Sequence, residues 1–497
     1  MSAAGSPDAT RPGGHRADPH TGLARQSVGL PGVVFQSVTF MAPGGSIATS
    51  VAVAAAYAGG ALSLSVLITL VAALIVASSI GQLARHLPSA GSIYTYPAQG
   101  LHPYLGFLVG WGYALITGLV GPIVNLLIGY FVGTELNTEF GWNFRTMWII
   151  FMLLPAVLTA LSGYFGVKLG TRAGVVLGAI EILVFVALAI SMFAHATAAG
   201  LTLGTFTLKY ATVKGFTGAS GLAGGSVYVL LAFVGFEAAA PLAEEARDPR
   251  RTVPRAVLLS CLVVGVLFLF TTAAVAAYVG PAHVAGYGGL GGGSPWILFG
   301  RQLWGWGWVI VFLAIVNSFF ANGNSALIAA TRTWYAMGRI RLLPGAFART
   351  SQRRDSPTVG ITAQTVLTLV IALPLGLGFG PATAFQLLAT ILSAVMIGIY
   401  IVINISVIGY YARRQRAEFN WLLHLVLPII GALILLPALA AAVGVGASWL
   451  KFVSPLPYPV SDAGLAVGIW FAAGLIYLGY LRARHPERVR NMGQVFD

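Results

Sequence analysis

The chain contains 497 residues, of which 57% are hydrophobic and only 8% are Asp, Glu, Lys or Arg. Soluble domains carry about 25% charged residues, so the composition excludes a soluble enzyme, a disordered chain and a single-span receptor. The net charge of +14 and the mean hydropathy of +0.84 fit a polytopic membrane protein whose basic residues collect in cytoplasmic loops. We therefore expect a lipid bilayer around the protein and no nucleic-acid partner.

The chain begins with a polar segment, 1–30, whose Pro and Gly content predicts a disordered cytoplasmic tail rather than a signal peptide. A bilayer core about 30 Å thick needs about 20 mostly apolar residues per helix. By this measure the sequence predicts an all-α membrane protein with twelve transmembrane helices. They are expected at 33–57, 60–80, 103–132, 146–164, 173–196, 223–243, 254–279, 304–331, 359–378, 383–410, 423–442 and 463–481.

Basic residues support this topology. With the N-terminus in the cytoplasm, 23 of the 28 Lys and Arg residues fall on the cytoplasmic side. The five on the other side are Arg145, Lys209, Lys214, Arg301 and Lys451. A misplaced span would scramble this alternation, so we predict a multi-pass protein of the cytoplasmic (inner) membrane with both termini cytoplasmic.

Two of the expected spans are interrupted. The first contains Pro-Gly-Gly-Ser at 43–46, and the sixth contains Gly235 followed by Pro241. Irregular backbone at membrane depth persists only where protein or a watery cavity satisfies it, although such glycines also allow close helix packing. Breaks in the first and sixth spans indicate a transporter built from two inverted five-helix repeats. The expected divisions are 31–200 for spans 1–5, 220–412 for spans 6–10, 420–482 for the last two spans and 483–497 for a cytoplasmic tail.

Such breaks suit a particular kind of cargo. Backbone amides after Pro43 carry partial positive charge and suit a carboxylate, whereas carbonyls at the ends of the half-helices suit an ammonium group. The sequence therefore predicts an α-amino acid or a related amine as the small-molecule substrate.

Two carboxylates fall inside expected spans: Glu181, in GAIEILVFVALAI, and Glu237, in LLAFVGFEAAAPLAEE. A carboxylate at bilayer depth costs several kcal/mol unless it is paired, hydrated or protonated, which favours a functional role. The alternative is a neutral Glu that donates a hydrogen bond between helices. In span 8, a polar stripe at helical spacing either faces the same cavity or joins helices by hydrogen bonds; its members are Asn317, Ser318, Asn322 and Ser325.

Three stretches resemble motifs of the amino acid–polyamine–organocation (APC) superfamily of permeases. They are ARHLPSAGSIYTYPAQGLHPYLGFLVGWGYAL at 84–115, FVGFEAAAPLAEEARDPRRTVPRAV at 233–257, and ALIAATRTWYAMGRIRLLPGAFART at 326–350. The second is the most specific, because it is close to the pattern F-x-G-F-E…E-E…P-R-R-x-x-P-x-A. The resemblance covers about 25–485 and implies the leucine-transporter-like fold, a 5+5 inverted repeat with two further C-terminal helices.

The resemblance also implies site residues. Glu237 matches the acidic position that contacts the substrate and helps gate it, whereas Leu231 falls where related exchangers place a large aromatic residue. Glu181 falls where some proton-coupled members carry a lysine, so the position, although not the sign of charge, implies proton coupling. The implied substrate-binding residues are Ala42, Pro43, Gly44, Gly45, Ser46, Leu231, Phe233, Val234, Gly235, Phe236 and Glu237, with Asn322 and Ser325 as cavity-lining candidates.

The expected function is secondary active transport of an amino acid or related amine by alternating access, coupled to protons. An amino acid/polyamine exchanger without proton coupling is the alternative, and a membrane-embedded enzyme is a remote one. No Asp lies in an expected span, the single Cys261 has no His nearby, and the sequence has neither H-E-x-x-H nor a phosphate-binding G-x-x-x-x-G-K-[ST] loop. We therefore expect no enzyme activity, no cofactor and no metal.

Overall fold

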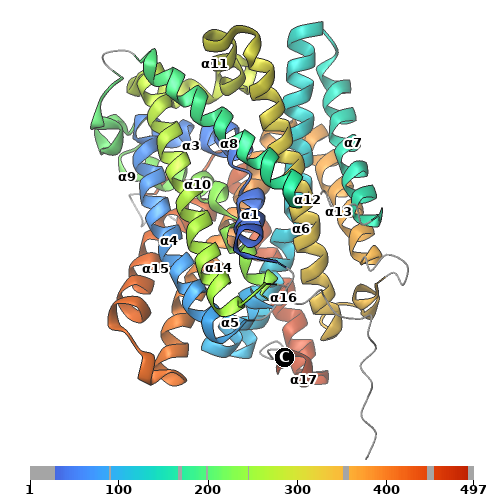
Figure 1. Cartoon of the computed structure of the whole chain (residues 1–497). Coiled ribbons are helices and arrows are strands. Elements are labelled where there is room, and N and C mark those ends of the chain that lie inside the picture. The colour runs from blue at the N-terminus through green and yellow to red at the C-terminus, as the bar shows by residue number, and fades with distance from the viewer. Residues whose placement is uncertain are drawn as a thin grey trace, which may run out of the picture.

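The computed structural model describes 28–88, 91–165, 171–196, 200–243, 246–350, 357–444 and 453–490 (Figure 1). The expected disordered tail at 1–30 lies outside the described residues except for its last three. The longer α-helices are α1 (Leu30–Met41), α3 (Ser50–Ala58), α4 (Leu62–His86), α5 (Ser92–Gly100), α6 (Pro103–Phe140), α7 (Phe144–Phe165), α8 (Thr171–Ala194), α9 (Ala219–Phe233), α10 (Pro249–Val279), α11 (Pro295–Trp304), α12 (Trp308–Arg339), α13 (Thr358–Phe379), α14 (Pro381–Arg413), α15 (Leu427–Ala442) and α16 (Ala463–Arg484).

Short elements complete the described part of the chain. Two short α-helices are α2 (Pro43–Ala48) and α17 (Pro486–Arg490), and the short 3₁₀ or π turns are η1 (Gly59–Ala61), η2 (Leu203–Phe206), η3 (Leu208–Tyr210), η4 (Phe236–Leu242), η5 (Pro281–Gly293), η6 (Gly305–Gly307), η7 (Gly345–Ala348), η8 (Arg416–Glu418), η9 (Leu422–Val426) and η10 (Val460–Asp462). Strands β1 (Thr212–Val213) and β2 (Phe216–Thr217) form an antiparallel hairpin in which Thr212 pairs with Thr217.

The helices have the length and composition of membrane spans. Within the described ranges, eleven helical segments are long and apolar enough to cross a membrane, which confirms the expected polytopic, all-α class. The first expected span is not among them, because it is divided into α1, α2 and α3, while α3 runs through η1 into α4. The count of twelve and the division into repeats remain predictions.

Several helices extend beyond the apolar stretches. The expected span at 103–132 continues as α6 to Phe140, where Gly141 ends it in a left-handed conformation (φ +67°). Glu135 and Glu139 thus lie on a helix rather than in a loop. Apolar length does not predict α5 or α11, because each is only about half the length of a membrane span.

The divided first span lies inside the bundle. Figure 1 shows α1 in the middle of the molecule, and it packs against α8, α10, α12 and η4. Of the neighbouring segments, α3 packs against α9 and η5, and α4 packs along α10. Every residue of α2 is buried. The break in the first span is therefore enclosed by protein, as irregular backbone at membrane depth requires.

Candidate functional site

The break in the first span occurs at one residue. Helix α1 ends at Met41, Ala42 adopts a left-handed conformation (φ +45°), and α2 begins at Pro43. Proline suits the first position of a helix because that position needs no amide donor. A left-handed alanine is uncommon and costs free energy, so the surrounding contacts must hold it there.

The break in the sixth span lies directly against the first. Helix α9 ends at Phe233, and Gly235 (φ +125°) connects it to η4. A Cβ atom at Gly235 would come within 2.7 Å of Phe40 Cδ1 and 2.9 Å of the Met41 nitrogen. Glycine is required both for this conformation and for this approach. The structure thus brings the two interrupted segments together.

The carboxylate of Glu181 accepts a hydrogen bond from the backbone directly after Pro43. Its Oε1 atom accepts hydrogen bonds from the Gly44 nitrogen at 2.6 Å and from Ser318 Oγ at 2.6 Å. The Gly45 nitrogen donates to the same Ser318 hydroxyl at 2.9 Å, and Asn317 Nδ2 lies 3.5 Å from Glu181 Oε2. These amides are the ones predicted to bind a substrate carboxylate; in this conformation the carboxylate of Glu181 binds the Gly44 amide instead.

Glu237 lies at the second break and is 1% exposed. Its Oε2 atom accepts hydrogen bonds from the Gly235 nitrogen and from Tyr400 Oη, each at 2.9 Å. The Tyr400 ring stacks on Phe236 with centroids 5.2 Å apart. Across the described ranges, neither Glu237 nor Glu181 forms an ion pair. The site therefore has two buried carboxyl groups, and no Lys or Arg of the described segments forms an ion pair with either.

Other predicted residues take different positions. Ser46 Oγ donates to the Met41 carbonyl at 2.7 Å, and Asn322 Nδ2 donates to the Phe40 carbonyl at 2.9 Å, so both stabilise the break. Phe233 packs edge-on against Phe268 of α10. Ser325 is buried on α12, Leu231 is half-buried on α9, and Val234 is buried directly after α9. No side-chain contact among the described residues assigns these three to the site, and a role in substrate binding stays a prediction for every residue of the predicted set.

Two residues at the breaks are not predicted from the sequence. Tyr400, on α14, donates to Glu237, and Ser37 Oγ, on α1, donates to the Phe236 carbonyl at 3.0 Å. Each residue places a hydroxyl group in a largely apolar stretch, and this is the only feature of the sequence that could have indicated a role in the site. The sequence does not show which helix the hydroxyl group contacts. Within the described segments, no group of three or more His, Cys, Asp or Glu side chains is arranged to hold a metal ion.

Comparison with known proteins identifies the family. The family model described as amino acid permease matches 34–477. The chain belongs to the amino acid permease family. It is thus a member of the amino acid–polyamine–organocation superfamily of transporters, which confirms the resemblance noted from its motifs.

Two relatives match along almost their whole length. The low-affinity putrescine importer PlaP of Escherichia coli is 25% identical, over 93% of this chain and 96% of its own. The branched-chain amino acid permease BcaP of Lactococcus lactis is 26% identical, over 92% and 93%. The lysine-specific permease LysP of Lactococcus lactis is 26% identical over 59% of this chain and 58% of its own. The names of these relatives cover a diamine, apolar amino acids and a basic amino acid.

Proposed function

We propose that this permease is a secondary active transporter that moves an amino acid or a related amine across the cytoplasmic membrane by alternating access, coupled to protons. The relatives named for putrescine, branched-chain amino acids and lysine support this class of cargo. The observation that carries the proposal is the pairing of Glu181 with the Gly44 amide at the break of the first span.

The cargo's ammonium group binds beside Glu237. This carboxyl group is buried without an ion-pair partner among the described residues, and a buried negative charge favours a cationic ligand strongly. The Gly235 amide and the Tyr400 hydroxyl both donate to Oε2, so they orient the carboxyl group from the second break. Glu237 therefore contacts both the cargo and the irregular backbone at Gly235, which changes conformation during transport.

Glu181 couples a proton to the cargo by competition for the same amides. An ionised Glu181 holds the Gly44 amide and the Ser318 hydroxyl through charge-assisted hydrogen bonds. Protonation weakens these bonds because a neutral carboxyl group is a poorer acceptor. The amides of Gly44 and Gly45 then become accessible to a carboxylate of the cargo, so that one proton accompanies one amino acid.

This mechanism also separates two kinds of cargo. An α-amino acid must displace Glu181 to reach the amides at the break, whereas an amine without a carboxylate can bind beside Glu237 and leave Glu181 in place. We infer that uptake of amino acids depends on the protonation of Glu181 and that uptake of simple amines does not.

Exchange without proton coupling is the second candidate. The specific observation in its favour is that both oxygens of Glu181 contact donors, Oε1 at 2.6 Å and Oε2 at 3.5 Å, as expected of a permanent structural link. In that case Glu181 holds α2 against α8 and α12 throughout the transport cycle. A cargo molecule then crosses the membrane only in exchange for another cargo molecule from the opposite side.

The experiment that separates these functions is uptake of radiolabelled cargo into proteoliposomes. A panel of amino acids and amines is tested with and without an inward proton gradient, in empty and preloaded vesicles. Stimulation by the gradient in empty vesicles supports proton-coupled transport. Uptake only into preloaded vesicles supports exchange, and uptake of no amino acid or amine under either condition contradicts both. Glu237→Ala must reduce binding or uptake in either case.

A further inference from the structure

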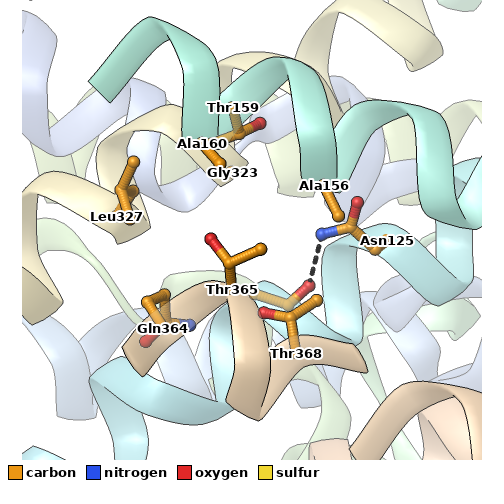
Figure 2. A pocket seen from close by; sticks show the side chains of 10 residues that line it. Asn125, Ala156, Thr159, Ala160, Gly323, Leu327, Gln364, Thr365 and Thr368 are labelled. Carbon is orange, nitrogen blue, oxygen red and sulfur yellow. Dashed lines mark hydrogen bonds between the residues drawn. The ribbon is translucent and has the colours of Figure 1, made fainter. Parts of the chain in front are cut away.

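A second polar site lies among helices that carry neither break. A small cavity is lined by α6, α7, α12 and α13, as Figure 2 shows. Its lining residues are Gly121, Asn125, Ala156, Thr159, Ala160, Gly323, Leu327, Gln364, Thr365 and Thr368. None of these side chains is charged, and five of them present oxygen atoms. The cavity is thus distinct from the site that contains Glu181 and Glu237.

Two amide side chains of this cavity are only half-satisfied. Asn125 Nδ2 donates to the Gly121 carbonyl at 2.8 Å, and Gln364 Nε2 donates to the Gly118 carbonyl at 2.9 Å. These bonds fix which end of each amide is the nitrogen. Asn125 Oδ1 and Gln364 Oε1 are buried and accept no hydrogen bond from any described residue. Leaving such an acceptor unpaired is costly, so both oxygens require a ligand.

The surrounding hydroxyls add further oxygen atoms. Thr365 Oγ1 donates its hydrogen to the Ile361 carbonyl at 2.9 Å, so toward the cavity it can act only as an acceptor. The close approach of α13 to α6 depends on Gly121, where a Cβ atom would come within 2.5 Å of Gln364 Nε2 and 2.6 Å of Thr368 Oγ1. The absence of a side chain at Gly121 therefore allows Gln364 and Thr368 of α13 to pack closely against α6.

The chemistry of these groups narrows the ligand. Zinc and other transition metals favour His and Cys ligands, and calcium or magnesium sites usually include carboxylates; the lining has none of these. Uncharged oxygen atoms can replace the hydration shell of a monovalent cation, as rings of backbone carbonyls do in potassium-selective filters. The cavity has a volume of about 20 Å³. One water-sized particle needs roughly 10–15 Å³, so the cavity has room for a single small ligand.

We propose that this cavity binds a monovalent alkali cation, with Asn125 Oδ1 and Gln364 Oε1 as ligands. The bound ion joins α6 to α13, and the threonine hydroxyls of the lining complete its shell. It stabilises the four helices that surround the cavity, and it does so independently of the cargo, of the proton and of the proposed transport function.

The test is thermal unfolding of the purified full-length protein in choline, sodium or potassium chloride at one ionic strength. Cys261 is the only cysteine of the sequence and is fully buried, so a thiol-reactive fluorophore reports unfolding directly. We expect sodium or potassium chloride to raise Tm saturably above its value in choline chloride. Equal Tm values in all three salts would mean that the cavity holds only water, and this would overturn the proposal.

Variants then assign the effect to this cavity. Asn125→Leu and Gln364→Leu should each abolish the cation-dependent rise in Tm. Gly323→Ala provides a milder change, because its Cβ would lie 3.5 Å from Val124 Cγ1 and 3.9 Å from Thr159 Oγ1, which are ordinary contacts. It should fold normally and reduce the rise by narrowing the cavity.

The matched control is Asn324→Leu. Asn324 follows the lining residue Gly323 on α12, but both ends of its amide already have a partner, with Nδ2 donating to the Phe320 carbonyl and Oδ1 accepting from Ser162. This variant should retain the full response to alkali cations even if its basal Tm falls. A response that survives in the folded variants of Asn125, Gln364 and Gly323 alike would contradict the assignment.

Discussion

Glu181 Oε1 lies 2.6 Å from the backbone nitrogen of Gly44, at the first turn of the half-helix that follows the break in span 1. The carboxylate comes from α8, 137 positions further along the sequence, and it meets Ser318 of α12 at the same point. A single side chain therefore joins three helices at the position where the backbone amides would otherwise be available to cargo.

Glu181→Gln is the first prediction. Glutamine keeps the size of the side chain and one oxygen that can accept from the Gly44 amide, but it cannot exchange a proton. We expect uptake to lose its stimulation by an inward proton gradient, while cargo-for-cargo exchange persists. The measurement is radiolabelled uptake at several external pH values. Glu418→Gln, which changes an exposed carboxylate paired with His86, is the control that should retain wild-type pH dependence. A wild-type pH profile in Glu181→Gln would remove this residue from the coupling step.

Gly44→Ala is the second prediction. A Cβ atom at this position would come within 2.5 Å of Phe185 Cε2 and 2.9 Å of Glu181 Oε1. Overpacking of this kind costs about 1–3 kcal/mol, and every 1.4 kcal/mol corresponds to a factor of about ten. We therefore expect the initial uptake rate to fall by about fivefold to about a hundredfold at equal amounts of folded protein. Gly398→Ala is the control on α14, since a Cβ there meets nothing within 4 Å, and undiminished uptake in Gly44→Ala would contradict the proposed geometry.

The sequence predicted the positions of both breaks but not how they meet. Pro43 and Gly235 indicate interruption locally, because proline lacks an amide donor and glycine tolerates positive φ. The contact of Gly235 with Phe40 and Met41 joins positions nearly 200 residues apart, and local pattern carries no information on such pairing. The same reasoning applies to Glu181: its position within an apolar helix is predictable from the sequence, but its partner amide at Gly44 is not.

Charge counting predicts which side of the membrane a residue lies on, but it does not predict which residues contact one another. Arg301 was expected only to lie outside the membrane, and the expected end of span 3 left Glu135 and Glu139 in a loop. In the structure α6 continues to Phe140, which places both carboxylates against Arg301. Apolar length marks where a helix leaves the bilayer, whereas the helix itself continues until a residue such as Gly141 ends it.

Tyr400→Phe is the third prediction. The change removes the hydroxyl that donates to Glu237 at 2.9 Å but keeps the ring that stacks on Phe236. A hydrogen bond to a charged group contributes about 1.5–3 kcal/mol, so we expect KM for the cargo to rise by about tenfold or more. Uptake kinetics across a range of cargo concentrations provide the measurement. Tyr480→Phe, at an exposed position of α16, is the control for loss of a hydroxyl. An unchanged KM in Tyr400→Phe would show that Glu237 does not depend on this donor to receive cargo.

Arg301→Met is the fourth prediction, and it concerns stability rather than transport. Arg301 Nη2 lies 2.7 Å from Glu135 Oε2, its Nη1 contacts Glu139, and its guanidinium carbon lies 3.8 Å from the centre of the Trp308 ring. The Glu135 side chain is only 7% exposed, so removal of the arginine leaves an unpaired, nearly buried carboxylate between α6 and α11. Breaking a buried pair in this way costs about 3–5 kcal/mol, and the partial exposure of Arg301 favours the lower end of that range.

The measurement is Tm of the purified variant, and the chain offers a matched control. Arg251 forms an ion pair with Asp248 at 3.7 Å, but these side chains are 77% and 58% exposed, and exposed pairs contribute at most about 1 kcal/mol. Arg251→Met should therefore leave Tm almost unchanged, while Arg301→Met lowers it clearly. Adding Glu135→Gln to Arg301→Met should recover part of the loss, because a neutral amide in place of the unpaired carboxylate removes the buried charge. Equal effects of the two arginine variants would mean that the pair with Glu135 is as weak as a surface contact.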